Sequence, residues 1–138
     1  MLVREIMTEE PITANPTTTT REVMELMYAQ DIRHLPVVDG DQLMGIISER
    51  DLRSLSMPVA SVLSDPAGAS KRLDEPISAI MRGDVISIET EAPVDDLIDM
   101  MIETKIGAVP VVEAGTETLV GIASYIDVLV AARSELES

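Results

Sequence analysis

Apolar residues recur with the spacing of an amphipathic helix in two separate stretches of the chain. In each stretch they fall at positions i, i+3, i+4 and i+7, so they share one face of a helix. The pattern predicts helices at about Arg21–Gln30 and at Pro93–Thr104. Thr19 and Glu22 have the spacing of a capping box, and Pro93 suits a first helical turn. The residues expected to face the core are Thr20, Val23, Met24 and Met27, and Val94, Leu97, Ile98 and Met101.

Each predicted helix is followed by two short apolar runs that are joined by a turn and then enter another helix. The runs have the length and β-branched composition of strands, and their turns contain Gly and acidic residues. The predicted strands are Leu35–Asp39, Leu43–Ile47, Val109–Glu113 and Leu119–Ala123, with short extended segments at Pro11–Ala14 and Val85–Ile88. The predicted later helices are Glu49 to about Leu55 and Tyr125 to about Glu135, and short amphipathic lead-ins stand at Val3–Met7 and Ile77–Met81.

The chain contains an internal repeat. Aligning Ile6-Met7 with Ile80-Met81 also aligns the Leu35–Val38 run with the Val109–Val112 run. Two extra residues in the second turn then bring Gly45–Asp51 onto Gly121–Asp127. One such unit cannot bury both of its faces alone. We therefore expect an α+β fold in which two pseudo-symmetric β-α-β-β-α repeats pack through their sheets into one module.

The repeats are predicted at residues 1–56 and 76–138, with a linker at 57–75 between them. Pro66–Ser70 is expected to be a flexible loop, because it combines Pro, Gly and Ser. Val59, Val62 and Leu63 are expected to dock on the core.

The composition excludes several classes of function. The formal charge of −15 disfavours general binding to nucleic acid or to anionic membranes. The absence of Cys excludes disulfides, thiol catalysis and thiolate metal sites, and a single His makes a histidine-based metal site improbable. Scattered acid with only two Lys is typical of a halophilic protein, although an ordinary acidic protein also fits. Met1–Thr13 is unlike a signal peptide, and no apolar run approaches a membrane span, so we expect a cytoplasmic protein.

The repeated stretch Gly45–Asp51 carries the candidate chemistry. A strand ends at Ser48, and Asp51 follows three residues later; Ser124 and Asp127 repeat this spacing. One interpretation is structural: the serine caps the helix and the aspartate is the acid of a capping box. The other is that the same geometry holds a ligand, because the helix start attracts an anion and a carboxylate accepts hydrogen bonds from hydroxyl groups. Both roles are compatible.

Arg50 distinguishes the two copies of the motif. A cation in the first turn of a helix is opposed by the helix dipole, and a bound phosphate would reverse that effect. The alternative is a surface arginine that pairs with Glu49 or Asp51. The second copy has Ile126 at this position, so its site lacks the charge.

The repeated motifs resemble the cystathionine-beta-synthase (CBS) domain, and the tandem resembles a CBS pair, or Bateman module. The matching residues are Ile6-Met7-Thr8, Ile12-Thr13, Ile32–Asp39 and Gly45–Asp51, and Ile80-Met81, Val85–Ser87, Ile106–Val112 and Gly121–Asp127. The resemblance covers nearly the whole chain outside the linker, as in a stand-alone CBS-pair protein. It implies a regulatory, energy-sensing module, not an enzyme, which binds AMP, ADP, ATP or S-adenosylmethionine in clefts between the repeats. It also implies a homodimer and no required cofactor.

The resemblance implies roles for particular residues. Ser48, Arg50, Asp51, Ser124 and Asp127 would contact ribose and phosphate. The weaker candidates, around the adenine and the cleft, are Ile12, Thr13, Arg33, His34, Pro36, Val37, Ile86, Ser87, Lys105, Pro110 and Val111. Packing, turn hydrogen bonds and ion pairs are alternative roles for these residues. A ligand-free module for dimerisation or for binding a protein target is the alternative function. Enzymatic turnover is disfavoured, because the sequence shows no activated nucleophile and no phosphate-binding Gly-rich loop.

Overall fold

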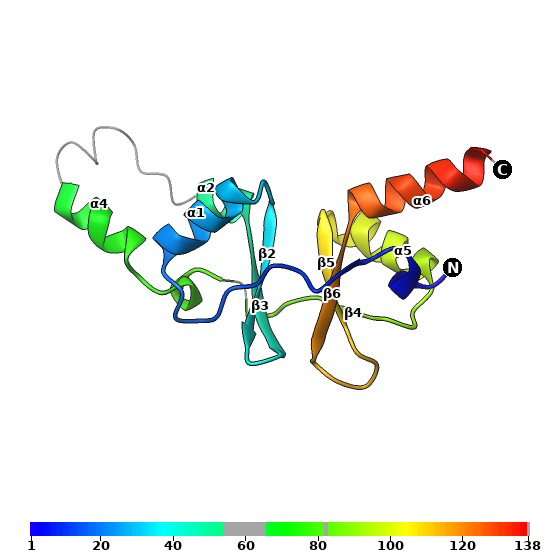
Figure 1. The fold of residues 1–138 in the computed structure, drawn as a ribbon, viewed down its shortest axis with the longest axis horizontal. Helices are drawn as coiled ribbons and strands as arrows, with labels where there is room; N and C mark the ends of the chain where they lie inside the picture. Colours follow the sequence, from blue (N-terminus) through cyan, green and yellow to red (C-terminus); the bar gives the residue numbers. More distant parts are fainter. Residues whose placement is uncertain (54–65, 82, 138) are drawn as a thin grey trace. The chain divides into compact units, whose positions relative to one another are not determined.

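The computed structural model describes residues 1–53, 66–81 and 83–137 (Figure 1). Helices and strands alternate, and the predicted α+β class is confirmed. The elements of the first part are η1 (Val3–Glu5), β1 (Thr8–Glu9), α1 (Thr20–Ala29), β2 (His34–Asp39), β3 (Gln42–Ser48) and α2 (Glu49–Arg53). The remaining elements are α4 (Pro66–Leu73), η2 (Ile77–Ala79), β4 (Ile88–Glu89), α5 (Val94–Thr104), β5 (Ala108–Val112), β6 (Leu119–Ser124) and α6 (Tyr125–Glu137).

The helix starts differ slightly from the predicted ones. Helix α1 begins at Thr20, because the Thr19 side chain accepts a 3.1 Å hydrogen bond from the Glu22 amide. Pro93 is not in the first turn of α5 as predicted; it is the residue before the helix, with an extended backbone. Its ring fixes φ but leaves ψ free, so a proline can occupy either position.

The prediction of a flexible loop at Pro66–Ser70 is wrong, because Pro66–Leu73 forms helix α4. Pro66 stands at the first helical position, where the missing amide hydrogen has no partner to lose. Lys71, Arg72 and Leu73 are good helix formers, and they outweigh the single glycine. The Arg21 side chain of α1 contacts Asp74, just past α4, with an Nε–Oδ1 distance of 3.3 Å. Val59, Val62 and Leu63, which were expected to dock on the core, lie outside the described residues.

The chain divides into two compact units. The four-stranded unit comprises Met1–Ile12, Asp41–Leu43 and Val85–Ser138. Its sheet has the order β1-β6-β5-β4, in which β6 is antiparallel to both of its neighbours and β4 is parallel to β5. Helices α5 and α6 belong to this unit and contact each other.

The two-stranded unit comprises Thr13–Gly40 and Met44–Asp84. Strands β2 and β3 form its sheet. Ala14 adds a parallel bridge to Val37, and this bridge is the repeat counterpart of the Ile88–Val111 pair in the other unit. Helices α1, α2 and α4 belong to this unit.

The lead-in of each repeat packs in the unit that holds the helices of the other repeat. Val3 is completely buried with Leu97, Val109 and Ala123 in the core of the four-stranded unit. Its counterpart Ile77 is completely buried in the core of the two-stranded unit. Each compact unit therefore combines segments of both sequence repeats.

The predicted core faces of α1 and α5 are largely confirmed. Thr20, Val23 and Met27 of α1 are buried, as are Val94 and Leu97 of α5. Met24 was predicted to face the core as well, but 43% of it is exposed. It lies at the edge of the helical stripe, where it borders the hollow described below.

Candidate functional site

Ser48 and Asp51 form a reciprocal pair at the junction of β3 and α2. The Ser48 amide donates to Oδ2 of Asp51 at 3.0 Å, and the Asp51 amide donates to Oγ of Ser48 at 3.0 Å. This geometry is a capping box, so the structural interpretation of the spacing is confirmed. A carboxylate offers about four acceptor positions, so a capping role does not by itself contradict a ligand contact.

The second copy of the motif has the same geometry where β6 enters α6. The Ser124 amide donates to Oδ2 of Asp127 at 2.8 Å, and the Asp127 amide donates to Oγ of Ser124 at 3.3 Å. The Ser124 hydroxyl also donates to Oδ2 at 3.2 Å. The two motifs lie in different compact units. The carboxylate and hydroxyl oxygens of the two motifs are arranged in the same way, and the motifs differ in the side chains around them.

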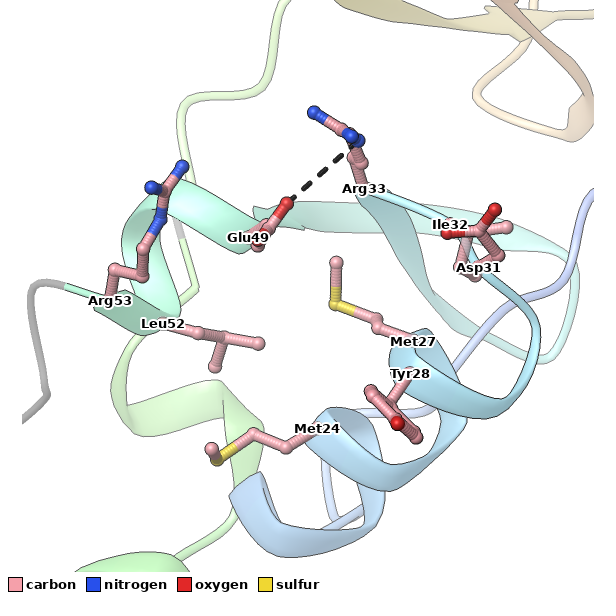
Figure 2. Close-up of a pocket in the computed structure, with 9 residues that line it drawn as sticks. All are labelled: Met24, Met27, Tyr28, Asp31, Ile32, Arg33, Glu49, Leu52 and Arg53. Carbon is pink, nitrogen blue, oxygen red and sulfur yellow. Dashed lines mark ion pairs between the residues drawn. The ribbon is translucent and has the colours of Figure 1, made fainter.

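Arg33 lies beside the first motif. Its carbonyl accepts a 2.8 Å hydrogen bond from the Glu49 amide, and its side chain pairs with the Glu49 carboxylate at 4.0 Å (Figure 2). In the second copy the Tyr125 amide makes the matching bond to the Gly107 carbonyl at 2.9 Å. The backbone arrangement is thus repeated, but Gly107 of the second copy stands where the first copy has the guanidinium-bearing Arg33.

Arg50 is exposed on α2. No ion pair within residues 1–53, 66–81 and 83–137 involves it, and Glu49 pairs with Arg33 instead. Ile126 gives the second motif an apolar side chain at the position of Arg50.

His34 is half-buried at the start of β2, close to the first motif. Burial lowers its pKa below the ordinary value of 6.5, and the positive charge of Arg33 adds to this effect. The carboxylates of Asp51 and Glu49 act in the opposite direction, but burial prevails. His34 is therefore electrostatically coupled to Asp51, and its imidazole favours the neutral form near pH 7.

Strand pairing places the threonine and serine candidates beside the proline-containing strands. The backbone amide of Ala14 donates to the Pro36 carbonyl at 3.0 Å, and its carbonyl accepts from the Val38 amide at 2.8 Å. The preceding residue, Thr13, therefore lies next to β2. Ser87 precedes Ile88, which pairs with Val111 on β5. Both side chains are half-buried.

The remaining candidates differ in exposure. Pro36, Val37, Pro110 and Val111 are fully buried, which favours a role in packing and in shaping the backbone. Ile12 and Ile86 are about two-fifths exposed. Ile12 belongs to the four-stranded unit and Thr13 to the two-stranded unit, so this adjacent pair is divided between units. Lys105 is exposed and takes a left-handed conformation at the end of α5.

A hollow of about 460 Å³ lies between α1 and α2 in the two-stranded unit (Figure 2). Apolar and aromatic side chains line much of it, and Arg33 and Arg53 add two guanidinium groups. The lining residues are Met24, Met27, Tyr28, Asp31, Ile32, Arg33, Glu49, Leu52 and Arg53. Sequence reasoning missed this feature. Its available signal was Met24 followed by Tyr28 at i+4, a second apolar pair next to the core stripe.

The family model of the CBS domain matches residues 3–57 and again residues 77–134. The chain belongs to the CBS-domain family. This match confirms the resemblance and the tandem arrangement of two CBS domains. A CBS domain-containing protein of Dictyostelium discoideum is 32% identical over 131 residues, which cover 94% of this chain and 89% of the relative.

Two solved structures are similar over nearly the whole chain. The CBS domain pair of protein MJ0100, in complex with 5-methylthioadenosine and S-adenosyl-L-methionine, is 29% identical, with a TM-score of 0.77. The similarity covers 98% of both chains. The structure of CBSX2 in complex with AMP is 26% identical, with a TM-score of 0.80 and 96% of each chain covered. Both of these similar CBS-pair structures contain adenosine-containing ligands.

Several curated relatives are much longer than the matched region. The chain spans 36% of a Methanocaldococcus jannaschii protein and 22% of the 5'-AMP-activated protein kinase gamma subunit of Dictyostelium discoideum. Within the described part of the chain, no helix has the length and apolar character needed to cross a bilayer. The same residues contain no group of three or more His, Asp or Glu side chains placed to hold a metal ion.

Proposed function

We propose that this CBS pair is a non-catalytic regulatory module that binds an adenine nucleotide at the Ser48–Asp51 motif. The reciprocal Ser48–Asp51 pair carries the proposal, because it fixes a carboxylate at the start of a helix in a CBS fold. Similar pairs hold AMP or S-adenosyl-L-methionine in their structures. Asp51 would accept from the ribose hydroxyls, and Arg50, Arg33 and Ser48 would hold the phosphate.

The charges around the two motifs support a preference for the first. Arg33 and Arg50 flank Ser48 and Asp51, whereas Gly107 and Ile126 occupy the matching positions around Ser124 and Asp127. Hydrogen bonds between charged groups are roughly twice as strong as neutral ones, so a phosphate gains most at the first motif. The second motif lacks this contribution, so we expect the nucleotide at the first motif.

The proposed signal is a population shift. A nucleotide changes the protein only by as much as it prefers one conformation or assembly over another. A target protein that recognises the favoured state would then respond to the concentration of nucleotide, as energy sensing requires. We propose a homodimer as the working assembly, in a cytoplasm that supplies the nucleotide. A salt-rich cytoplasm would suit the charge of −15, because screening is stronger there.

The experiment is a thermal-shift and calorimetric titration with AMP, ADP, ATP and S-adenosylmethionine. A ligand at 100 times its Kd should stabilise the folded protein by about 2.7 kcal/mol. Asp51→Ala should abolish the nucleotide shift. Asp127→Ala is the matched control, since it removes the same kind of cap from the second motif and should retain the shift. Arg50→Ala should weaken AMP binding by about tenfold and leave adenosine binding unchanged.

Two outcomes would overturn the proposal. Absence of both heat and shift with all four ligands would leave the ligand-free interaction module as the better function. Equal loss of binding in Asp51→Ala and Asp127→Ala would mean that the cap, rather than a ligand contact, explains the effect. Assays of nucleotide hydrolysis on the bound complex test the non-catalytic part, and turnover would contradict it.

A further inference from the structure

Glu49 is placed to pair with either of two arginines. Its Oε2 atom lies 4.0 Å from Nε of Arg33, and its backbone amide donates to the Arg33 carbonyl at 2.8 Å. Arg53 follows four residues later on the same helix, α2, and all three residues line the hollow (Figure 2). An acid that precedes a base by four residues has the favoured spacing for an ion pair on a helix. Glu49 therefore has one arginine as its partner and a second within reach.

The three charged residues occur together in the first repeat, and none has a charged counterpart in the second. Their counterparts are Gly107, Tyr125 and Leu129. The Tyr125 amide still donates to the Gly107 carbonyl at 2.9 Å, so this junction of strand and helix forms without any of the three charges. The charged set therefore belongs to the first site and is not a requirement of the fold.

The charge of Glu49 extends to the Ser48–Asp51 motif. Burial is the main influence on the pKa of His34 and lowers it. The Asp51 carboxylate raises this pKa, the Arg33 guanidinium lowers it and the Glu49 carboxylate raises it. All three charged groups thus act on one imidazole. Since exposed charges interact over about 8 Å at physiological salt, a phosphate bound beside Asp51 would experience the Glu49 charge as well.

The Arg33–Glu49 pair is easily broken. Its side chains are 72% and 47% exposed, and exposed ion pairs contribute little to the stability of a protein. A ligand can therefore take Arg33 from Glu49 at a small cost. Removing the Glu49 charge should also leave the melting temperature of the ligand-free protein unchanged, so changes in ligand binding can be measured on a folded variant.

We propose that Glu49 sets the preference of the first motif among adenine nucleotides, by exchanging between Arg33 and Arg53. In the free protein Glu49 pairs with Arg33. A phosphate that binds Arg33 displaces the carboxylate, which then pairs with Arg53 along α2. The displaced carboxylate stays near the ligand and repels it more strongly as the phosphate charge increases, so it opposes ATP more than AMP. This inference rests on the proposed function, and it adds a residue that selects for the monophosphate.

Calorimetric titration of the full chain with adenosine, AMP and ATP at about 0.15 M salt tests the inference. Glu49→Gln should tighten AMP binding by about threefold and ATP binding by about tenfold, and should leave adenosine binding unchanged. Glu25→Gln is the matched control, because it removes an exposed carboxylate of α1 in the same unit, outside the hollow. It should leave all three affinities within about twofold of the wild type.

A double-mutant cycle tests the exchange between the two arginines. Arg53→Gln removes the second partner of Glu49 and should weaken AMP binding by about threefold. In the Glu49→Gln background the same substitution should lose most of this effect, because Arg53 acts through Glu49. An equal loss in both backgrounds would mean that Arg53 attracts the phosphate directly, and it would overturn the exchange.

Failure of this inference can be distinguished from failure of the proposed function. A wild type that binds none of the three ligands would overturn the nucleotide site, and this inference with it. AMP binding that disappears in Asp51→Ala, with a ratio of ATP to AMP affinity that stays the same in Glu49→Gln, would overturn the role of Glu49 alone. A ratio that shifts towards ATP in Glu49→Gln, but not in Glu25→Gln, would support it.

Discussion

The backbone amide of Val3 donates to the carbonyl of Ala92 at 2.9 Å, and so ties the start of the first repeat to the core of the second. The repeat counterpart of this bond joins Ile77 to Thr18 at 2.7 Å. Both donors begin short 3-10 helices, and both side chains are completely buried. The lead-ins are therefore structural parts of the units in which they dock, and their removal should cost stability.

Ile77→Ala should lower the free energy of unfolding by about 2–5 kcal/mol, because it leaves a cavity in the core of the two-stranded unit. Urea denaturation without ligand measures this quantity. Ile86→Ala is the matched control, since that side chain is 40% exposed and its loss should cost much less. Equal effects of the two substitutions would mean that the docked lead-in contributes little to the core.

Gly121→Ala should destabilise the protein by about 1–3 kcal/mol, the usual range for an overpacked site. A β-carbon at Gly121 would lie 2.9 Å from the Thr8 carbonyl oxygen and 2.6 Å from the Met7 sulfur. Met7 can move, but Thr8 is held by the pairing of β1 with β6. Gly83→Ala is the control, because no atom lies within 4 Å of the added carbon. An unchanged melting temperature in Gly121→Ala would contradict the close approach of β1.

Lys105→Gly should raise the free energy of unfolding by about 0.5–1 kcal/mol. Lys105 ends α5 with a φ of 58°, which is unfavourable for a residue with a β-carbon. Glycine removes that penalty but gains freedom in the unfolded chain, so only part of the benefit remains. Lys105→Ala keeps the β-carbon and should bring no gain. A gain of equal size in both variants would assign the effect to the lost charge.

Acidification should destabilise the protein as the pH falls below about 6.5, through the protonation of His34. Burial lowers the pKa of His34 in the folded protein, so the unfolded chain binds this proton more readily. Stability therefore decreases as the pH drops from 6.5 towards the folded pKa, and is unaffected by this group above that window. Melting curves between pH 5.5 and 7.5, compared with His34→Gln, measure the effect.

His34 also offers a direct check on that prediction. It is the single histidine of the chain, so its ring resonances need no assignment in a proton NMR titration. A midpoint below 6.5 is expected. A midpoint above 6.5 would mean that the carboxylates of Asp51 and Glu49 prevail over burial. His34→Gln should then steepen, rather than flatten, the change of stability with pH.

Local patterns made the helices, strands and caps predictable. Ser48 and Asp51 form the capping box that their spacing indicates, because such a pair needs only four neighbouring residues to come together. Helix α4 was missed because Pro66 and Gly68 were interpreted as loop residues. A proline in the first turn and one interior glycine are both tolerated when the remaining residues favour a helix.

Contacts between distant segments could not be predicted in the same way. The alignment of the repeats is identical whether Val3 packs on its own repeat or on the other one. The Arg33–Glu49 pair and the hollow beside it depend on how α1, β2 and α2 meet. Met24 shows the same limit, because a residue at the edge of a helical stripe is buried or exposed according to its neighbours.

The exchanged lead-ins have a consequence for how such a chain can arise. A single repeat cannot complete its core with its own leading segment, because that segment is built to dock elsewhere. A protein with one repeat would have to form a dimer in which the two molecules exchange their leading segments. Duplication and fusion of its gene would join the two repeats into one chain, in which the leading segment of each repeat completes the core of the other.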